Sequence, residues 1–138
     1  MPTILRPYTL ADAKAFIAGS FELGPYQFAI IEQGRVVGSI ELLVNEHKIG
    51  HIGYWCAPEA RGKGVLTRAL RRLCRFGLFE LQLGRLELVT DPENKASQRV
   101  AQKVGFQREG TLRVHLPRPD GGRRDSVMFS LLPGELYD

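Results

Sequence analysis

The first residues whose types and spacing could do chemistry form a short glycine-rich segment with two basic side chains. It spans residues 58–66, Pro-Glu-Ala-Arg-Gly-Lys-Gly-Val-Leu, where a predicted strand is followed by a long predicted helix. The first amides of a helix have no partner within it and carry the positive end of its dipole. Gly62 and Gly64 let a ligand approach the backbone, and Arg61 and Lys63 add positive charge. The segment predicts a pyrophosphate cradle. On local physics, a basic glycine-rich turn without a ligand is an equal alternative.

Two familiar phosphate motifs and a metal site are excluded by pattern. The chain has neither the Gly-x-x-x-x-Gly-Lys-Ser/Thr loop of nucleoside triphosphatases nor a Gly-x-Gly-x-x-Gly dinucleotide fingerprint after a strand. His47 and His51 are four residues apart, but Gly50 and a predicted strand keep them off a common helical face. No set of three or four metal ligands is visible, so we expect no metal.

Length, composition and charge indicate an ordinary globular chain. The 138 residues suit a single domain over 1–138, and the net charge of +4 suits an anionic partner or simply a basic surface. No apolar run approaches the roughly 20 residues that span a bilayer, and the N-terminus does not resemble a signal peptide. Cys56 and Cys74 are too few for a disulfide scaffold and are typical of reduced thiols, so we expect a cytoplasmic protein.

The elements that must position these residues follow from hydrophobic spacing and turn residues. Helices are expected at residues 10–21, at 64–83 with Gly84 ending the helix, and between Asn94 as N-terminal cap and Gly105. Strands are expected at residues 3–7, 26–32, 35–44, 49–57, 85–90, 106–116 and 125–132, with a tight turn at Gln33-Gly34 and a turn at 117–122. This order predicts an α/β protein with a mixed sheet and helices on both faces.

Three blocks of the sequence resemble one family. Residues 52–55 (Ile-Gly-Tyr-Trp) and 58–64 resemble the acetyl-CoA motif of the GNAT N-acetyltransferases, whose pattern is Arg/Gln-x-x-Gly-x-Gly/Ala. Here Arg61 and Gly64 match the pattern, and Leu66 departs from its small final residue. Residues 94–110 and 120–130 resemble later motifs of the RimJ/RimL-like branch, the ribosomal-protein N-terminal acetyltransferases. The resemblance covers residues 3–132.

The resemblance implies a fold and a cofactor site. The fold is α/β (α+β): a mixed, mostly antiparallel sheet of six to seven strands, flanked by helices on both faces, with a shortened N-terminal helical region. Strand 52–57 is expected to diverge from strand 86–90, with the pantetheine of acetyl-CoA in the gap. The residues implied to bind the cofactor are Trp55, Cys56, Ala57, Arg61, Gly62, Lys63, Gly64, Val65, Leu66, Asn94 and Arg99.

The resemblance also implies the chemistry, which is direct attack of a neutral amine on the thioester. Ser97 matches the family position that gives a proton to the leaving coenzyme A. The glutamate expected as base falls at Leu116, so its neighbour His115 and the strand residue His51 are the candidates, with Glu41 or water as further ones. Histidine titrates near neutrality and can act as a base without a large pKa shift.

The acceptor is the least determined part of this interpretation. Only residues 7–25 precede the first hairpin, enough for one helix where relatives have two, so we expect an open acceptor side that suits a protein or peptide N-terminus. A partner subunit in a homodimer could equally complete the wall. Rival functions are acetylation of a small amine and a non-catalytic acetyl-CoA sensor. The arginines of the long helix could suit nucleic acid, but no recognised motif supports that, and we expect no membrane partner.

Overall fold

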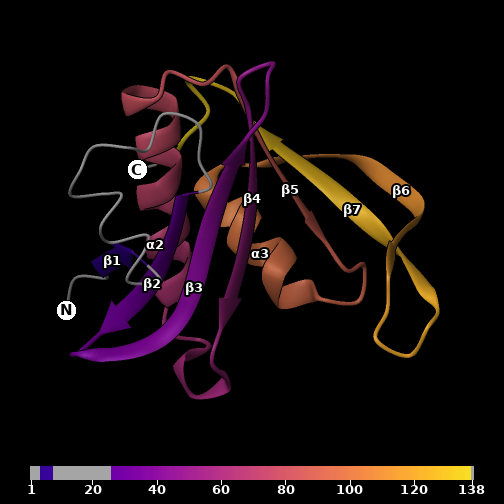
Figure 1. Ribbon diagram of the computed structural model, residues 1–138, viewed down its shortest axis with the longest axis horizontal. Helices are drawn as coiled ribbons and strands as arrows, with labels where there is room; N and C mark the ends of the chain where they lie inside the picture. The colour runs from indigo at the N-terminus through magenta and orange to yellow at the C-terminus, as the bar shows by residue number, and fades with distance from the viewer. Residues whose placement is uncertain (1–3, 8–25, 138) are drawn as a thin grey trace.

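A seven-stranded mixed sheet forms the centre of the structure, a computed structural model that describes residues 4–7 and 26–137. The helix expected at residues 10–21, and the shortened region it belongs to, lie outside the described residues. The strand order is β1-β2-β3-β4-β5-β7-β6, antiparallel throughout except for the parallel pair β4–β5 (Figure 1). The strands are β1 (Ile4–Pro7), β2 (Tyr26–Glu32), β3 (Arg35–Val44), β4 (Ile49–Cys56), β5 (Arg85–Thr90), β6 (Gln107–Pro117) and β7 (Arg123–Leu131). The expected mixed, mostly antiparallel α/β sheet is confirmed.

The long helix ends earlier than expected. A 3₁₀ turn (Pro58–Ala60) leads to α2 (Val65–Arg75), which continues as a π-helical turn (Phe76–Glu80). The expected end at Gly84 is wrong, because the left-handed residue that closes the helix is Gln82, with φ 55°. The Leu81 amide donates to the Phe76 carbonyl, and this wide turn stops the helix before Gly84 is reached.

Other local signals act as expected. Gln33 and Gly34 both have positive φ, 51° and 76°, as a two-residue hairpin turn requires. Helix α3 (Lys95–Val104) begins with the Asn94 side chain accepting from the Ser97 amide at 3.0 Å. It ends at Gly105 in the left-handed conformation. These caps fix where α3 begins, and therefore where Ser97 lies.

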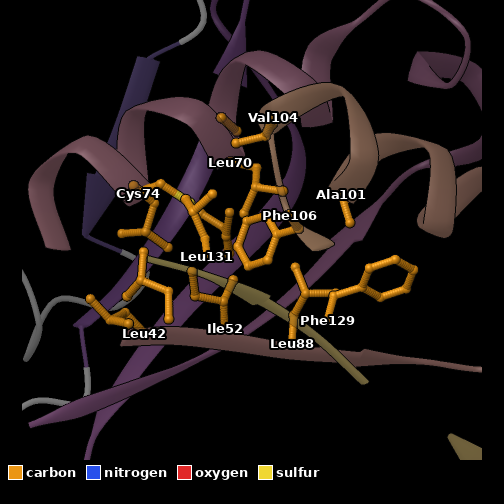
Figure 2. Close-up of a cluster of buried hydrophobic side chains, with 14 of the residues drawn as sticks. Leu42, Ile52, Leu70, Cys74, Leu88, Ala101, Val104, Phe106, Phe129 and Leu131 are labelled. Atoms are coloured by element: carbon orange, nitrogen blue, oxygen red, sulfur yellow. The ribbon is translucent and has the colours of Figure 1, made fainter. Parts of the chain in front are cut away.

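One face of the sheet packs against both described helices. Cross-strand register aligns Leu42 with Ile52, Ile52 with Leu88, and Leu88 with Phe129. Figure 2 shows this row beneath helical side chains that include Leu70, Cys74, Ala101 and Val104. Burial of each such hydrophobic side chain stabilises the folded state by about 1.5–3 kcal/mol. The core packs α2 and α3 against β3, β4, β5 and β7.

The opposite face of the central strands is polar. It carries Gln27, Glu41, His51, Glu87 and Ser130, which alternate along their strands with the core residues. The sequence predicts helices on both faces, and the remaining expected helix, at residues 10–21, lies outside the described residues. No described helix has the length and apolar character to cross a membrane.

Candidate active site

Strands β4 and β5 stop pairing about halfway along their length. They pair in parallel from Ile49–Arg85 to Ile52–Leu88, the last pair in the register. Beyond it, β4 continues beside β3 as far as Cys56, and β5 continues beside β7 as far as Thr90. Figure 1 shows the two strands diverging toward their carboxyl ends. The sheet therefore has a V-shaped opening at its middle, as the family resemblance implied.

A cavity of about 340 Å³ lies where β4 ends and α2 and α3 begin. Three cationic side chains, Arg61, Arg99 and Lys103, line it. Most of the expected cofactor residues also line it: Trp55, Cys56, Arg61, Gly62, Gly64, Val65, Leu66, Asn94 and Arg99. Ala57 and Lys63 are not among the lining residues. Sequence reasoning did not select Tyr54, Ala60, Thr67, Ala96, Val100 and Lys103, although Lys103 follows Arg99 at the four-residue spacing of one helix face.

The turn before α2 is shaped by its glycines. Gly62 and Gly64 have φ of 77° and 75°, a conformation that side chains with a Cβ rarely adopt. The Arg61 Nε donates to the Cys56 carbonyl at 3.2 Å, which ties the turn to the end of β4. In α2 the Arg68 amide donates to the Gly64 carbonyl, and the amides before it have no partner within the helix. Amides, a helix dipole and three cations around one cavity suit a polyphosphate.

Tyr54 links β4 to the start of α3. Its phenol oxygen lies 3.0 Å from Oγ of Ser97 and donates to the Ser97 carbonyl at 3.1 Å. Burial raises the pKa of Tyr54 to about 12, although the hydrogen bond to Ser97 lowers it. Tyr54 therefore keeps its proton at neutral pH. Both residues line the cavity, and their separation of 43 residues means that no local spacing could have paired them.

A chain of charged groups lies on the opposite face of the sheet, at the closed end of the opening. His51 Nδ1 lies 3.2 Å from Glu87 Oε1, and Arg85 Nε donates to Glu87 Oε2 at 2.6 Å. Two further Arg85 nitrogens donate to Glu109 at 2.7 Å each, and Ser130 donates to Glu109 at 2.6 Å. The side chain of His51 is 49% exposed. The arrangement holds Nδ1 of His51 against a carboxylate, so Nε2 is the ring nitrogen that remains for other groups.

These contacts shift the pKa values of Arg85 and Glu109, the ion pair in this row of charged groups. Hydrogen bonds from Arg85, and then from Ser130, lower the pKa of Glu109 to about 2. Glu109 and Glu87 raise the pKa of the Arg85 guanidinium above its ordinary value. Both partners therefore remain ionised at neutral pH, and Arg85 holds the carboxylate that meets His51.

His115 has different surroundings. Its Nδ1 lies 2.9 Å from Oγ of the buried Ser126, and its carbonyl accepts from Arg123 at 2.9 Å. The register of β6 is irregular between Leu112 and Leu116, and Val114 takes a φ of 51°. His115 does not line the cavity. The structure thus brings Ser97 to the cavity and places His51 and His115 apart from it and from each other.

The described residues contain no cluster of His, Cys, Asp and Glu that could hold a metal ion. Cys56 and Cys74 are both free and buried. Burial raises the pKa of the Cys56 thiol, which lines the cavity. Thiols of this kind are poor nucleophiles at neutral pH.

Comparisons with known proteins agree on one family. The profile of the acetyltransferase (GNAT) domain matches residues 1–107. The chain is 34% identical over 116 residues to the putative ribosomal N-acetyltransferase YdaF of Bacillus subtilis, covering 83% of this chain and 63% of that protein. It is 33% identical over 88 residues to the spermidine N(1)-acetyltransferase of Escherichia coli, covering 62% and 47%. The first relatives thus extend beyond the match, and this chain spans less than two thirds of their length.

The fold is similar to that of solved acetyltransferase structures. A putative ribosomal-protein-serine acetyltransferase from Vibrio cholerae superposes with a TM-score of 0.73 at 28% identity, over 91% of this chain and 76% of that one. The profile match and the structural similarity both indicate an acetyltransferase fold of this family.

Proposed function

The chain belongs to the GNAT acetyltransferase family, and we propose that it transfers an acetyl group from acetyl-CoA to the N-terminal amine of a protein or peptide. The observation that carries the proposal is the opening between β4 and β5. Beyond Ile52–Leu88 the strands separate, and the opening lies between a cationic cavity on one side and a polar face with a histidine–carboxylate pair on the other. An opening placed in this way would let a donor and an acceptor meet from opposite faces.

The residues around the cavity fit coenzyme A. The amides at the start of α2, with Arg61, Arg99 and Lys103, suit its phosphates. The bound thioester supplies an acyl carbon that an amine can attack.

Two proton transfers accompany the reaction, and the chain offers a group for each. An ammonium has no lone pair, so the acceptor must first lose a proton, and His51, oriented by Glu87, accepts it. As the new C–N bond forms and the C–S bond breaks, the electron pair stays on sulfur. Ser97 Oγ–H donates a proton to that sulfur and recovers, through solvent, the proton that the new amide nitrogen releases. Tyr54 holds the Ser97 hydroxyl in place. His115 is the alternative base, without a carboxylate partner in the described structure.

Two relatives point to two classes of acceptor. YdaF carries a ribosomal N-acetyltransferase name, which supports a protein N-terminus, whereas the E. coli relative is named for spermidine. The Vibrio cholerae structure is also named for a ribosomal protein. A peptide amine is therefore the leading acceptor, and a small polyamine is the second.

An amine panel tests the proposal. The protein is incubated with acetyl-CoA and tetrapeptides with free N-termini, the same peptides already N-acetylated, or spermidine, and release of free thiol is measured. Free peptides should be acetylated, and N-acetylated ones should not react. Efficient acetylation of spermidine with no reaction of peptides would refute the peptide acceptor but keep the acetyltransferase. Binding of acetyl-CoA without turnover of any amine would leave the sensor function in its place.

A further inference from the structure

A second cavity of about 340 Å³ lies over β2, β3 and β4. Its lining includes Gln27, Ser39, Glu41 and Gly53, which share the sheet face of His51. Tyr54 and Trp55 line this cavity and the cationic one alike. The two cavities therefore adjoin at the stretch of β4 that has left β5.

Glu41 is the acidic residue in that lining. Its Oε2 accepts from Gln27 Nε2 at 3.3 Å, which orients the carboxylate. Glu41 is the direct cross-strand partner of Gly53, the first residue of β4 beyond the last β4–β5 pair. A negative charge thus stands beside the start of the opening.

The carboxylate is also close to the proposed base. His51 pairs with Leu43 in the register, so Glu41 and His51 are diagonal neighbours on one face of an antiparallel pair. Such residues are about 7–8 Å apart, and their long side chains can reach a common point. One nitrogen atom between them could contact both groups. Glu87, beside His51, is already bound to Arg85, which leaves Glu41 as the carboxylate that faces the second cavity.

We propose that Glu41 is the binding site for the ammonium form of the acceptor amine, and that Gly53 keeps the path from this site to the opening clear. This inference rests on the proposed function and names its acceptor site. The ammonium pairs with Glu41 and passes its proton to His51. The resulting amine attacks across Gly53. Trp55, 56% exposed, provides an aromatic wall suited to a cation or to the apolar groups beside it.

Gly53 offers a substitution that tests access without breaking the strand. A Cβ there would lie 3.5 and 3.7 Å from Glu41 atoms, which is ordinary contact. At Gly38, by contrast, a Cβ would collide with the Trp55 carbonyl. Gly53→Ala should therefore fold normally and place a methyl group between the carboxylate and the opening.

The experiment compares Glu41→Gln and Gly53→Ala with the wild-type chain. Glu46→Gln is the control, because it removes the same charge at a side chain 86% exposed outside both cavities. Three quantities are measured: the KM for a tetrapeptide with a free N-terminus, the Kd of acetyl-CoA, and the calorimetric Kd of the peptide for the chain saturated with CoA.

Glu41→Gln and Gly53→Ala should each raise the peptide KM and Kd at least tenfold and change the acetyl-CoA Kd less than twofold. Glu46→Gln should change none of them. Unchanged peptide binding in Glu41→Gln, or a loss of kcat alone, would overturn the inference. If the wild-type chain acetylates no amine, the proposed function fails separately. Calorimetry with the free and N-acetylated peptides still decides whether Glu41 binds an ammonium.

Discussion

The phenol oxygen of Tyr54, on β4, lies 3.0 Å from Oγ of Ser97, at the start of α3. His51 and Glu87 meet at 3.2 Å on the other face of the sheet. The group proposed to give a proton and the group proposed to take one therefore approach the opening from opposite faces. In the proposed reaction, the amine enters from one face and the thiol leaves on the other.

Tyr54→Phe should lower the acetylation rate about three- to tenfold, because it removes the hydroxyl that holds Ser97 but keeps the ring. In a Ser97→Ala background the same change should have little further effect. Steady-state rates of the wild type, the two single variants and the double variant complete this double-mutant cycle. An equal loss in both backgrounds would mean that Tyr54 does not act through Ser97.

Gly64→Val should abolish the thermal stabilisation by acetyl-CoA, which for a bound ligand at a hundred times its Kd is about 2.7 kcal/mol. Gly64 has a φ of 75° and begins α2 beside the cavity. Gly34→Val is the matched control, since Gly34 has a φ of 76° in a hairpin turn with nothing near its Cβ position. It should lose stability yet keep its response to acetyl-CoA. If acetyl-CoA stabilised both variants equally, the proposal that the turn at Gly64 binds its phosphates would be contradicted.

Glu87→Gln should lower kcat about tenfold at neutral pH, because His51 would lose its charged hydrogen-bond partner. The Kd of acetyl-CoA should not change, since Glu87 does not line the cationic cavity. Glu80→Gln, at an exposed residue after α2, is the control. A normal rate in Glu87→Gln would remove the assignment of His51 as an oriented base and favour His115.

The acid stability of the chain should depend on Glu109. Its pKa is lowered from 4.5 to about 2 by Arg85 and Ser130, so its contribution is present above pH 4.5 and is lost as the pH falls toward 2. Urea midpoints at pH 6 and pH 3 should therefore differ less for Glu109→Gln than for the wild type. The carboxylate is partly exposed, so added salt should reduce the difference further. If the urea midpoint fell equally between pH 6 and pH 3 in the wild type and in Glu109→Gln, Glu109 would not be the group that causes the loss of stability in acid.

Phe129→Ala should cost about 3–5 kcal/mol of unfolding free energy, because Phe129 is fully buried in the row with Leu88 and Ile52. Val36→Ala, at a side chain 64% exposed, should cost little. Urea denaturation measures both. A small effect at Phe129 would mean that the core beneath the helices does not support the sheet.

Features that depend on neighbours in the chain were predictable. The turn at Gln33-Gly34 was predicted from the residues that accept positive φ, and the caps of α3 from Asn94 and Gly105. The glycine-rich turn before α2 lies at a cationic cavity, as a phosphate cradle requires, and its binding of phosphate stays a prediction. The helix end was misplaced, because a π-helical turn and Gln82 close it before Gly84.

The sequence by itself determined the family pattern, most of the described elements and the local backbone of the glycine-rich turn, because these depend on residues a few positions apart. Only the tertiary structure decided which distant groups meet. Tyr54 reaches Ser97, His51 reaches Glu87, and Glu41 lies beside Gly53. These pairs follow from strand register and from the point where β4 leaves β5. Register is a property of whole strands packed on a shared core, so it cannot be derived from the spacing within any single segment.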